Sequence, residues 1–201
     1  MVNKVLAEIH RYWFGLLTAP SDAAKSKADM WFTRSDLTDA FIRDNFGKYL
    51  NAARTTEWDL PNLSREEKVG LVVLLDQFPR NIFRETGDAF ASDEKARAIA
   101  RELVKGGEWT KFYAVEQAFV LLPFEHSEDI VDQDFSVLLF AERIFVTPPN
   151  LIESARMHLD FATKHRDIIR KFGRFPHRNA VLGRPTTAEE QAFLDGGGFA
   201  G

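Results

Sequence analysis

Two short segments combine acids, bases and amides in patterns that suit acid–base chemistry. In LLDQFPRNIFR, helical spacing puts Asp76 on an apolar face, four residues before Arg80, so that the two side chains can pair. In PFEHSED, Glu125 and His126 fall in a connection between helices, where rigid scaffolds often carry functional groups. Histidines and carboxylates are common general acids and bases, and a nearby carboxylate can orient the imidazole. The candidate catalytic residues are Asp76, Glu125, His126 and His177.

A third segment, from Lys164 to Arg184, holds seven Lys or Arg residues against one Asp, in a chain whose net charge is −4. It contains GRFPHRN (173–179), where a Gly and a Pro prevent a regular helix. A guanidinium forms two parallel hydrogen bonds to a carboxylate or phosphate, so Arg174 and Arg178 are expected to bind a small anion. The candidate ligand-binding residues are Arg80, Asn81, His165, Arg174, Arg178 and Asn179.

A structural role competes with the functional one for each segment. The five acids of residues 125–134 could neutralise the basic segment as an ion network, because partly buried charges need partners. Pro79 is expected to kink or end its helix, and Pro123 to end another, while Ser127 is expected to cap the next helix. In this alternative the motifs are loop locks that fix helix ends.

Composition and spacing exclude several classes of protein. The absence of Cys excludes disulfides, zinc ribbons and thiol nucleophiles. Neither H-x-x-x-H nor a nucleotide-binding or serine-hydrolase motif occurs, so no metal or cofactor is predicted, although a cross-segment site from His126, His177 and a carboxylate stays open. The negative net charge argues against nucleic acid as a partner. No apolar run could span a bilayer or act as a signal peptide, which predicts no membrane association and a cytoplasmic location.

The elements that must position these groups are predicted to be helices throughout. Capping boxes begin helices at Ser64 and Thr187, and prolines and Gly173 bracket a long helix between them. No alternating strand pattern occurs, so the fold class is all-α, with about eight to ten helices. The other helices are expected near 3–15, 22–32, 36–53, 92–105, 110–122 and 128–145. We expect one domain over residues 1–194, followed by a Gly-rich tail at 195–201.

The three segments, with YWFG upstream, closely resemble the bacterial domain-of-unknown-function family 924 (DUF924). The resemblance runs from about Trp13 to Leu194 and includes LLPFEHSEDIVDQDFSVLLF and HRDIIRKFGRFPHRNAVLGRPTTAEEQAFL. It implies a tetratricopeptide-like fold, in which antiparallel helix pairs stack into a right-handed array, and it brings no established activity. The matched positions are Asp76, Gln77, Arg80, Asn81, Glu125, His126, Ser127, Asp129, Gln133, His165, Arg174, His177, Arg178, Asn179 and Arg184.

Two functional hypotheses follow, beside the structural one. Polar residues bunch in three segments, which favours a compact pocket for a small anionic molecule, with His and Glu supplying hydrolase-type acid–base chemistry. The implied fold favours instead a helical-repeat scaffold whose groove binds a peptide or protein partner.

Overall fold

The computed structural model describes residues 2–198, except the side chains of Val2, Asn3 and Phe32, and that part of the chain is helical without strands. Residues 199–201 of the expected tail lie outside it, and residue 195 belongs to the last helix. The α-helices are α1 (Val2–Phe14), α2 (Ala28–Phe32), α3 (Asp36–Thr55), α4 (Arg65–Ile82), α5 (Asp93–Lys105), α6 (Ala114–Glu125), α7 (Ile130–Val146), α8 (Ile152–Phe172) and α9 (Ala188–Asp195).

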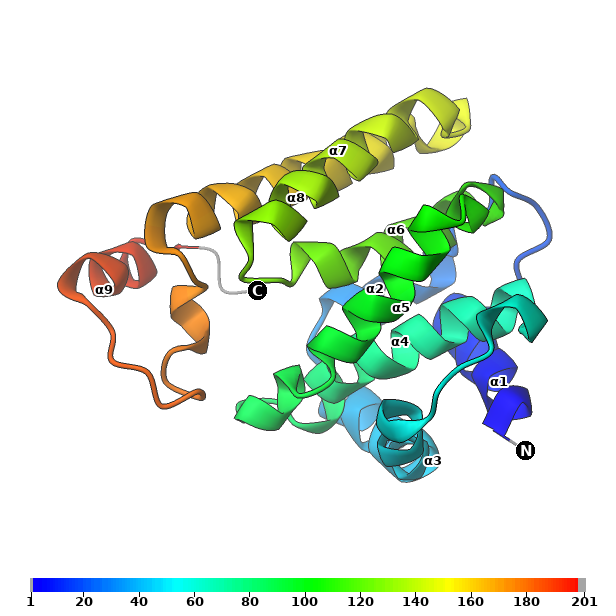
Figure 1. The fold of residues 1–201 in the computed structure, drawn as a ribbon, viewed down its shortest axis with the longest axis horizontal. Coiled ribbons are helices and arrows are strands. Elements are labelled where there is room, and N and C mark those ends of the chain that lie inside the picture. Colours follow the sequence, from blue (N-terminus) through cyan, green and yellow to red (C-terminus); the bar gives the residue numbers. More distant parts are fainter. Residues whose placement is uncertain (1, 199–201) are drawn as a thin grey trace.

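Helix α4 runs through the centre of the molecule and contacts α1, α3, α5 and α6 (Figure 1). Its residues 68–76 are buried without interruption, because neighbouring helices cover it on all sides. Gly70 allows α1 to approach closely, because a Cβ there would overlap the carbonyl oxygen of Leu6 in α1. The capping box predicted at Ser64 begins the helix, with Ser64 and Glu67 each bonding the other's backbone N–H.

Helices α7 and α8 lie side by side as a pair along one face of the molecule (Figure 1). Helix α6 connects this pair to the centre, since it contacts α4, α5, α7 and α8. One large apolar core joins the helices from α1 to α8. The all-α prediction is confirmed, whereas the right-handed tetratricopeptide-like stacking stays a prediction.

The end expected at Pro123 was wrong, the end expected near Pro79 lies three residues beyond it, and the cap expected at Ser127 is another residue. Helix α4 continues past Pro79 to Ile82, and α6 continues past Pro123 to Glu125. The packing around each helix keeps the residues after the proline helical, although the proline has no N–H for the backbone hydrogen bond. Asp129, not Ser127, caps α7: its carboxylate accepts the N–H of Val131. The Ser127 hydroxyl instead accepts the N–H of Asp129.

Other boundaries shifted for local reasons. Only residues 28–32 of the expected 22–32 helix are α-helical, after a short 3-10 turn at Lys25–Lys27. Helix α6 begins at Ala114 rather than near 110, because residues 108–111 form a 3-10 turn instead. Helix α8 ends as expected at Gly173, whose φ of 68° is the left-handed conformation that glycine adopts without strain.

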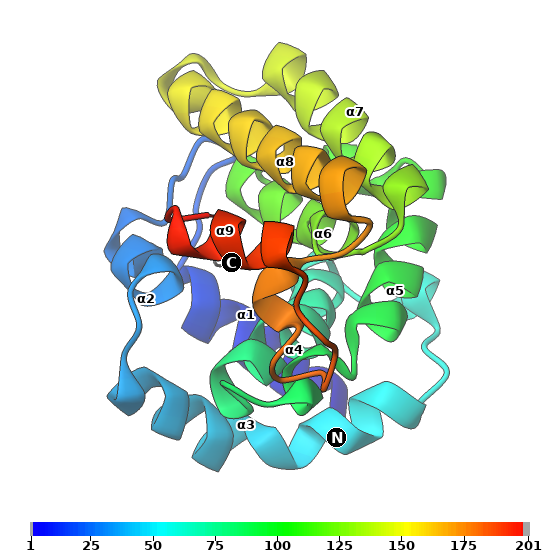
Figure 2. The ribbon, with the colours of Figure 1, turned by 90° about the vertical axis from the view of Figure 1, so that its left-hand side faces the viewer.

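After α8 the chain forms a strap, which we define as residues 173–187, before α9 (Figure 2). The strap holds one 3-10 turn, Pro176–Arg178, and is otherwise irregular. A small second apolar cluster fixes it to α8: Phe175 is fully buried beside Ile168 and Ile169, and Phe193 of α9 packs there as well. The strap thereby carries the third polar segment back towards α4 and α6.

Candidate functional site

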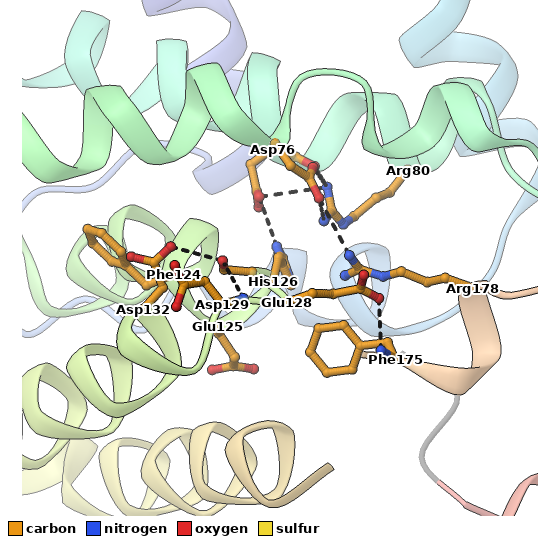
Figure 3. A network of polar contacts seen from close by, with 12 residues as sticks. Asp76, Arg80, Phe124, Glu125, His126, Glu128, Asp129, Asp132, Phe175 and Arg178 are labelled. Carbon is orange, nitrogen blue, oxygen red and sulfur yellow. Dashed lines mark hydrogen bonds and ion pairs between the residues drawn. The ribbon is translucent and has the colours of Figure 1, made fainter. Parts of the chain in front are cut away.

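A buried carboxylate and a histidine meet between the carboxyl-terminal half of α4 and the end of α6 (Figure 3). Asp76 is fully buried, and its Oδ1 lies 2.8 Å from Nδ1 of His126. His126 is the residue that ends α6, so the helix end turns its ring towards α4. The imidazole donates Nδ1–H to the carboxylate, and this contact fixes Nε2 as the nitrogen with a free lone pair.

Electrostatics favours a charged carboxylate beside a neutral imidazole. Burial opposes ionisation of Asp76, but His126 and Arg80 outweigh it and hold the pKa of Asp76 at about 2. Burial, reinforced by Arg80, lowers the pKa of His126 despite the opposite pull of Asp76. The contact is therefore a hydrogen bond from a neutral ring to a carboxylate, and a neutral ring is able to accept a proton.

Arg80 orders the other side of Asp76. Its Nη1 donates to the backbone oxygen of Asp76 at 2.5 Å and lies 3.7 Å from Oδ1 of the carboxylate. Its stronger partner is Asp93, the first residue of α5, through two parallel bonds of 2.9 and 3.0 Å. The i to i+4 pairing expected from sequence is thus secondary to a contact between helices.

Arg178 of the strap reaches the same place with its guanidinium unpaired by hydrogen bonds. The residue is 6% exposed, and its guanidinium carbon lies 4.4 Å from the Phe90 ring centroid and 4.5 Å from that of Phe175. No described residue accepts a hydrogen bond from this guanidinium, and Asp93 Oδ2 is 3.8 Å away. Burial and the neighbouring Arg80 lower the pKa of Arg178 to about 10. It is charged at neutral pH, and its Nε is buried without a hydrogen-bond partner among the described residues.

Glu125 and His165 form a second buried pair nearby, on the side of His126 away from α4. Nδ1 of His165 lies 3.1 Å from Oε1 of Glu125 and donates to the Phe161 carbonyl at 2.9 Å. Burial, then Asp76, raises the pKa of Glu125 to about 8, and burial lowers the pKa of His165 to about 3. At neutral pH both groups are uncharged, so the contact is not an ion pair although the two atoms are only 3.1 Å apart.

His177 completes the cluster from the strap. Its ring centroid lies 5.6 Å from that of Phe175, and its Nδ1 is buried without a hydrogen-bond partner. Burial, followed by the charge of Arg178, lowers the pKa of His177 to about 4. We call these residues the central cluster: Asp76, Arg80, Asp93, Glu125, His126, His165, His177 and Arg178.

Three candidates lie elsewhere. Arg174 does not face the cluster: it forms two bonds, of 2.6 and 2.9 Å, to the buried carboxylate of Glu190 in α9. Asn179 bonds the same carboxylate at 3.2 Å. Asn81, on another face of α4, donates to Asp39 of α3 at 2.7 Å. These three contacts hold secondary elements together, and they correct the expectation that Arg174 is left free for a ligand.

Acid–base pairing between the segments also anchors the strap. Glu128 accepts two bonds from Arg184, at 2.6 and 3.0 Å, and one from the backbone N–H of Phe175 at 2.8 Å. Asp134 binds Arg170 at 2.7 Å. The opposite charge blocks therefore neutralise each other in part, whereas Arg178 remains without a bidentate acid.

Sequence reasoning missed Asp93, Phe90 and Glu190. Asp93 reads as an ordinary acid in the first turn of a helix, and Glu190 as the partner in a capping box, which it also is. Nothing local marks either as a partner for an arginine. In the described part of the chain, no group of three or more His, Asp or Glu residues is placed to hold a metal ion. No described helix is long and apolar enough to cross a membrane.

The fold and cluster define an all-helical protein with a buried carboxylate–imidazole–guanidinium site. A model of the family described as bacterial protein of unknown function (DUF924) matches residues 9–198, and the chain belongs to that family. The chain is also similar to a solved structure, that of the protein of unknown function ATU0120 from Agrobacterium tumefaciens. The two are 33% identical with a TM-score of 0.81, over 98% of this chain and 99% of the other. No curated protein matches.

Proposed function

We propose that the central cluster binds a small anionic compound, a carboxylate or a phosphate, and performs hydrolase-type acid–base chemistry on it. The observation that carries the proposal is Arg178: a buried guanidinium between two aromatic rings, whose Nε–H donates to no described residue. Leaving such donors unpaired is costly, and an anion would satisfy them bidentately. Arg80, beside it, adds positive charge.

The acid–base roles follow from the two neighbouring pairs. His126 acts as the general base through Nε2, because Asp76 occupies its Nδ1 and burial keeps the ring neutral. Glu125, with a pKa of about 8, holds its proton at neutral pH and acts as the general acid. Environments that push two titratable groups towards opposite protonation states are typical of acid–base sites. The centroids of the His126 and His165 rings are 6.5 Å apart, so the base lies next to the pair that holds the acid.

Ligand binding is tested by thermal unfolding with inorganic phosphate, acetate and a panel of phosphorylated and carboxylated metabolites. A ligand at one hundred times its dissociation constant adds about 2.7 kcal/mol, which raises Tm by roughly 2–4 °C for a chain of this size. The rise is expected to disappear in Arg178→Met and to persist in Arg156→Met, a control at an exposed arginine of α8. Equal shifts in both variants would contradict the proposal.

Chemistry is tested separately with p-nitrophenyl phosphate and p-nitrophenyl acetate as generic substrates. Turnover is expected to fall by roughly two to four orders of magnitude in His126→Asn, as for other general bases. Binding without turnover would leave a non-catalytic anion site.

A second candidate is the loop-lock role, and it is favoured by the outer half of the strap. Arg174, Asn179 and the N–H of Thr187 converge on Glu190, and this buries a carboxylate whose only evident task is to hold α9. Under this role Arg178→Met would lower the free energy of unfolding by a few kcal/mol, as loss of a buried polar network does. Under the anion-site role the same change costs little stability and abolishes the ligand-induced rise.

A further inference from the structure

The charges of the central cluster balance one another before any ligand binds (Figure 3). Arg80 forms two bonds to Asp93, and its Nη1 lies 3.7 Å from Oδ1 of Asp76. Nη1 of Arg178 lies 3.8 Å from Oδ2 of Asp93. Two guanidinium groups are thus matched by two carboxylates. The other four members are uncharged at neutral pH, because burial keeps Glu125 protonated and the three histidines unprotonated.

An anion that pairs with Arg178 therefore adds a negative charge that no positive charge of the cluster balances. Burying an uncompensated charge is costly, and a second negative charge on the same ligand would double the demand. The cluster as defined contains no lysine and no third arginine, so it gains a positive charge only by taking up a proton. The ligand that fits this balance is a monoanion that binds together with one proton.

His177 is placed to take up that proton. It precedes Arg178 in the 3-10 turn of the strap, and both side chains lie against the ring of Phe175. The ring centroid of His177 is 5.6 Å from that of Phe175, and the guanidinium carbon of Arg178 is 4.5 Å from it. Nδ1 of His177 is buried without a hydrogen-bond partner among the described residues. A protonated ring would therefore offer an N–H to the anion.

The other two histidines of the cluster are already engaged. Nδ1 of His126 lies 2.8 Å from Asp76, and Nδ1 of His165 donates to the Phe161 carbonyl at 2.9 Å. The base role of His126 also requires an unprotonated Nε2 until the reaction begins. A proton taken up on binding is therefore expected at another residue.

Several elements contribute charges that act on His177. The titratable and charged groups around it are Arg178 of the strap, Arg80 of α4, His126 at the end of α6, Glu128 in the turn before α7 and His165 of α8. Burial and the charge of Arg178 lower the pKa of His177 to about 4, whereas Glu128 acts in the opposite direction. A bound anion adds a second negative neighbour. At a separation of about 4 Å, that charge strengthens proton binding by about a thousandfold.

We propose that the central cluster binds a monoanionic acid together with one proton, which His177 takes up as the anion pairs with Arg178. This inference rests on the proposed anion site and adds the charge class of its ligand. That class is a compound with one negative charge, such as a monocarboxylate, rather than a dianion such as a phosphate monoester at neutral pH. The proton and the anion strengthen each other's binding by the same factor.

The direct test is a set of histidine ring ¹⁵N spectra of the labelled protein at about pH 6.5, where acetate is almost fully ionised. The spectra are recorded with acetate and with acetamide, its uncharged analogue. The His177 ring is expected to be neutral with acetamide and to become an imidazolium as acetate saturates the site. His158 is the internal control, because its pKa is also about 4 and it lies beside Arg143, outside the cluster. Its ring should stay neutral throughout.

Affinity gives a second measurement. Between about pH 7 and pH 6 the Kd of acetate is expected to fall several-fold, with tenfold as the limit for one proton. Glu125 stays protonated over this window, so it contributes little. In His177→Gln the Kd should be higher and nearly independent of pH. Malonamate and malonate have matched skeletons and carry one and two negative charges. At about pH 7 malonamate is expected to bind at least about tenfold more tightly.

Three results would overturn the proposal while leaving the anion site in place. The first is binding of acetate with a neutral His177 ring and the same Kd at both pH values. The second is an imidazolium at His126 instead of His177. The third is equal affinity for malonate and malonamate. Failure of every probe to bind at about 100 mM would instead remove the anion site itself, and this proposal with it.

Discussion

The two ends of α4 carry the same three kinds of group in different surroundings. At one end, in the central cluster, the buried Asp76 contacts His126, and Arg178 stacks on an aromatic ring. At the other end the buried Glu116 of α6 contacts His10 of α1 at 2.6 Å, a contact that we call the α1 pair, and Arg65 stacks on Tyr113. At the α1 pair, Arg65 is neutralised by Glu66 at 2.6 Å and keeps part of its side chain in solvent. In the central cluster, Arg80 and Arg178 share Asp76 and Asp93, and both arginines are largely buried. The comparison shows that two largely buried guanidinium groups sharing two carboxylates, rather than the carboxylate–histidine contact, distinguish the proposed anion site.

The largest expected effect is therefore that of Asp76→Asn. The change leaves two largely buried guanidinium groups with one carboxylate, and breaking a buried pair in this way costs about 3–5 kcal/mol. Urea unfolding of the variant, compared with wild type, measures the loss. A loss below about 1 kcal/mol would mean that Asp93 alone balances the arginines.

The protonation state of Glu125 gives the next effect. Its pKa is raised to about 8, so the folded state holds a proton that the unfolded state releases near the ordinary carboxylate range. This stabilisation is complete below that ordinary range and is lost as pH rises through about 8. Between pH 6.5 and 8 we expect the free energy of unfolding to fall by up to about 1.4 kcal/mol per pH unit.

The variant that tests this dependence is Glu125→Gln, which has no proton to release. Its free energy of unfolding is expected to be nearly flat over the same pH window, as measured by denaturant unfolding at each pH. Parallel slopes for the variant and wild type would show that another group is responsible.

A smaller loss is expected for Glu116→Gln at the α1 pair, despite equal burial. Arg65 keeps its bond to Glu66, and the new amide oxygen still accepts from the N–H of Tyr113. The cost should be about 1–2 kcal/mol, the range for a hydrogen bond to a charged group. Urea unfolding of this variant and of Asp76→Asn measures the difference between the two losses. Equal losses would show that the two ends of α4 do not differ in this respect.

The smallest effect concerns the strap. Glu128→Gln weakens the two bonds from Arg184 and the bond from the Phe175 N–H, so the strap should open locally more often while the global free energy of unfolding changes little. Hydrogen exchange of the Phe175 amide is expected to speed up several-fold, whereas the amides of α4 keep their rates. Unchanged exchange at Phe175 would show that its apolar packing alone holds the strap.

Much of the fold followed from local signals in the sequence. The capping boxes at Ser64 and Thr187 and the left-handed Gly173 each act within a few residues, so they gave correct helix ends. Neither proline ends its helix at its own position, because the cost of a proline is local, whereas the packing that outweighs it comes from distant helices. Pro79 and Pro123 both lie in buried turns of α4 and α6.

The polar segments could be found, but their partners could not. Asp76, His126 and Arg178 could be singled out because their residue types suit acid–base chemistry or anion binding. Asp93 and Glu190 look like ordinary acids in the first turn of a helix. Arg174 could be identified as a candidate, but its partner Glu190 could not be predicted. Its partner lies 16 positions away in a helix whose direction depends on the strap, so spacing alone offers no rule for the pair.

The order of the chain gives the two ends of α4 different histories during translation. Both residues of the α1 pair are present once Glu116 has been synthesised. The central cluster also requires Arg178, and the ion pair that anchors the strap to Glu128 requires Arg184. At roughly 5–20 residues per second, a ribosome delivers those residues several seconds after Glu116. A nascent chain therefore passes through an interval in which Asp76 and His126 are already synthesised while the strap that encloses them is still absent.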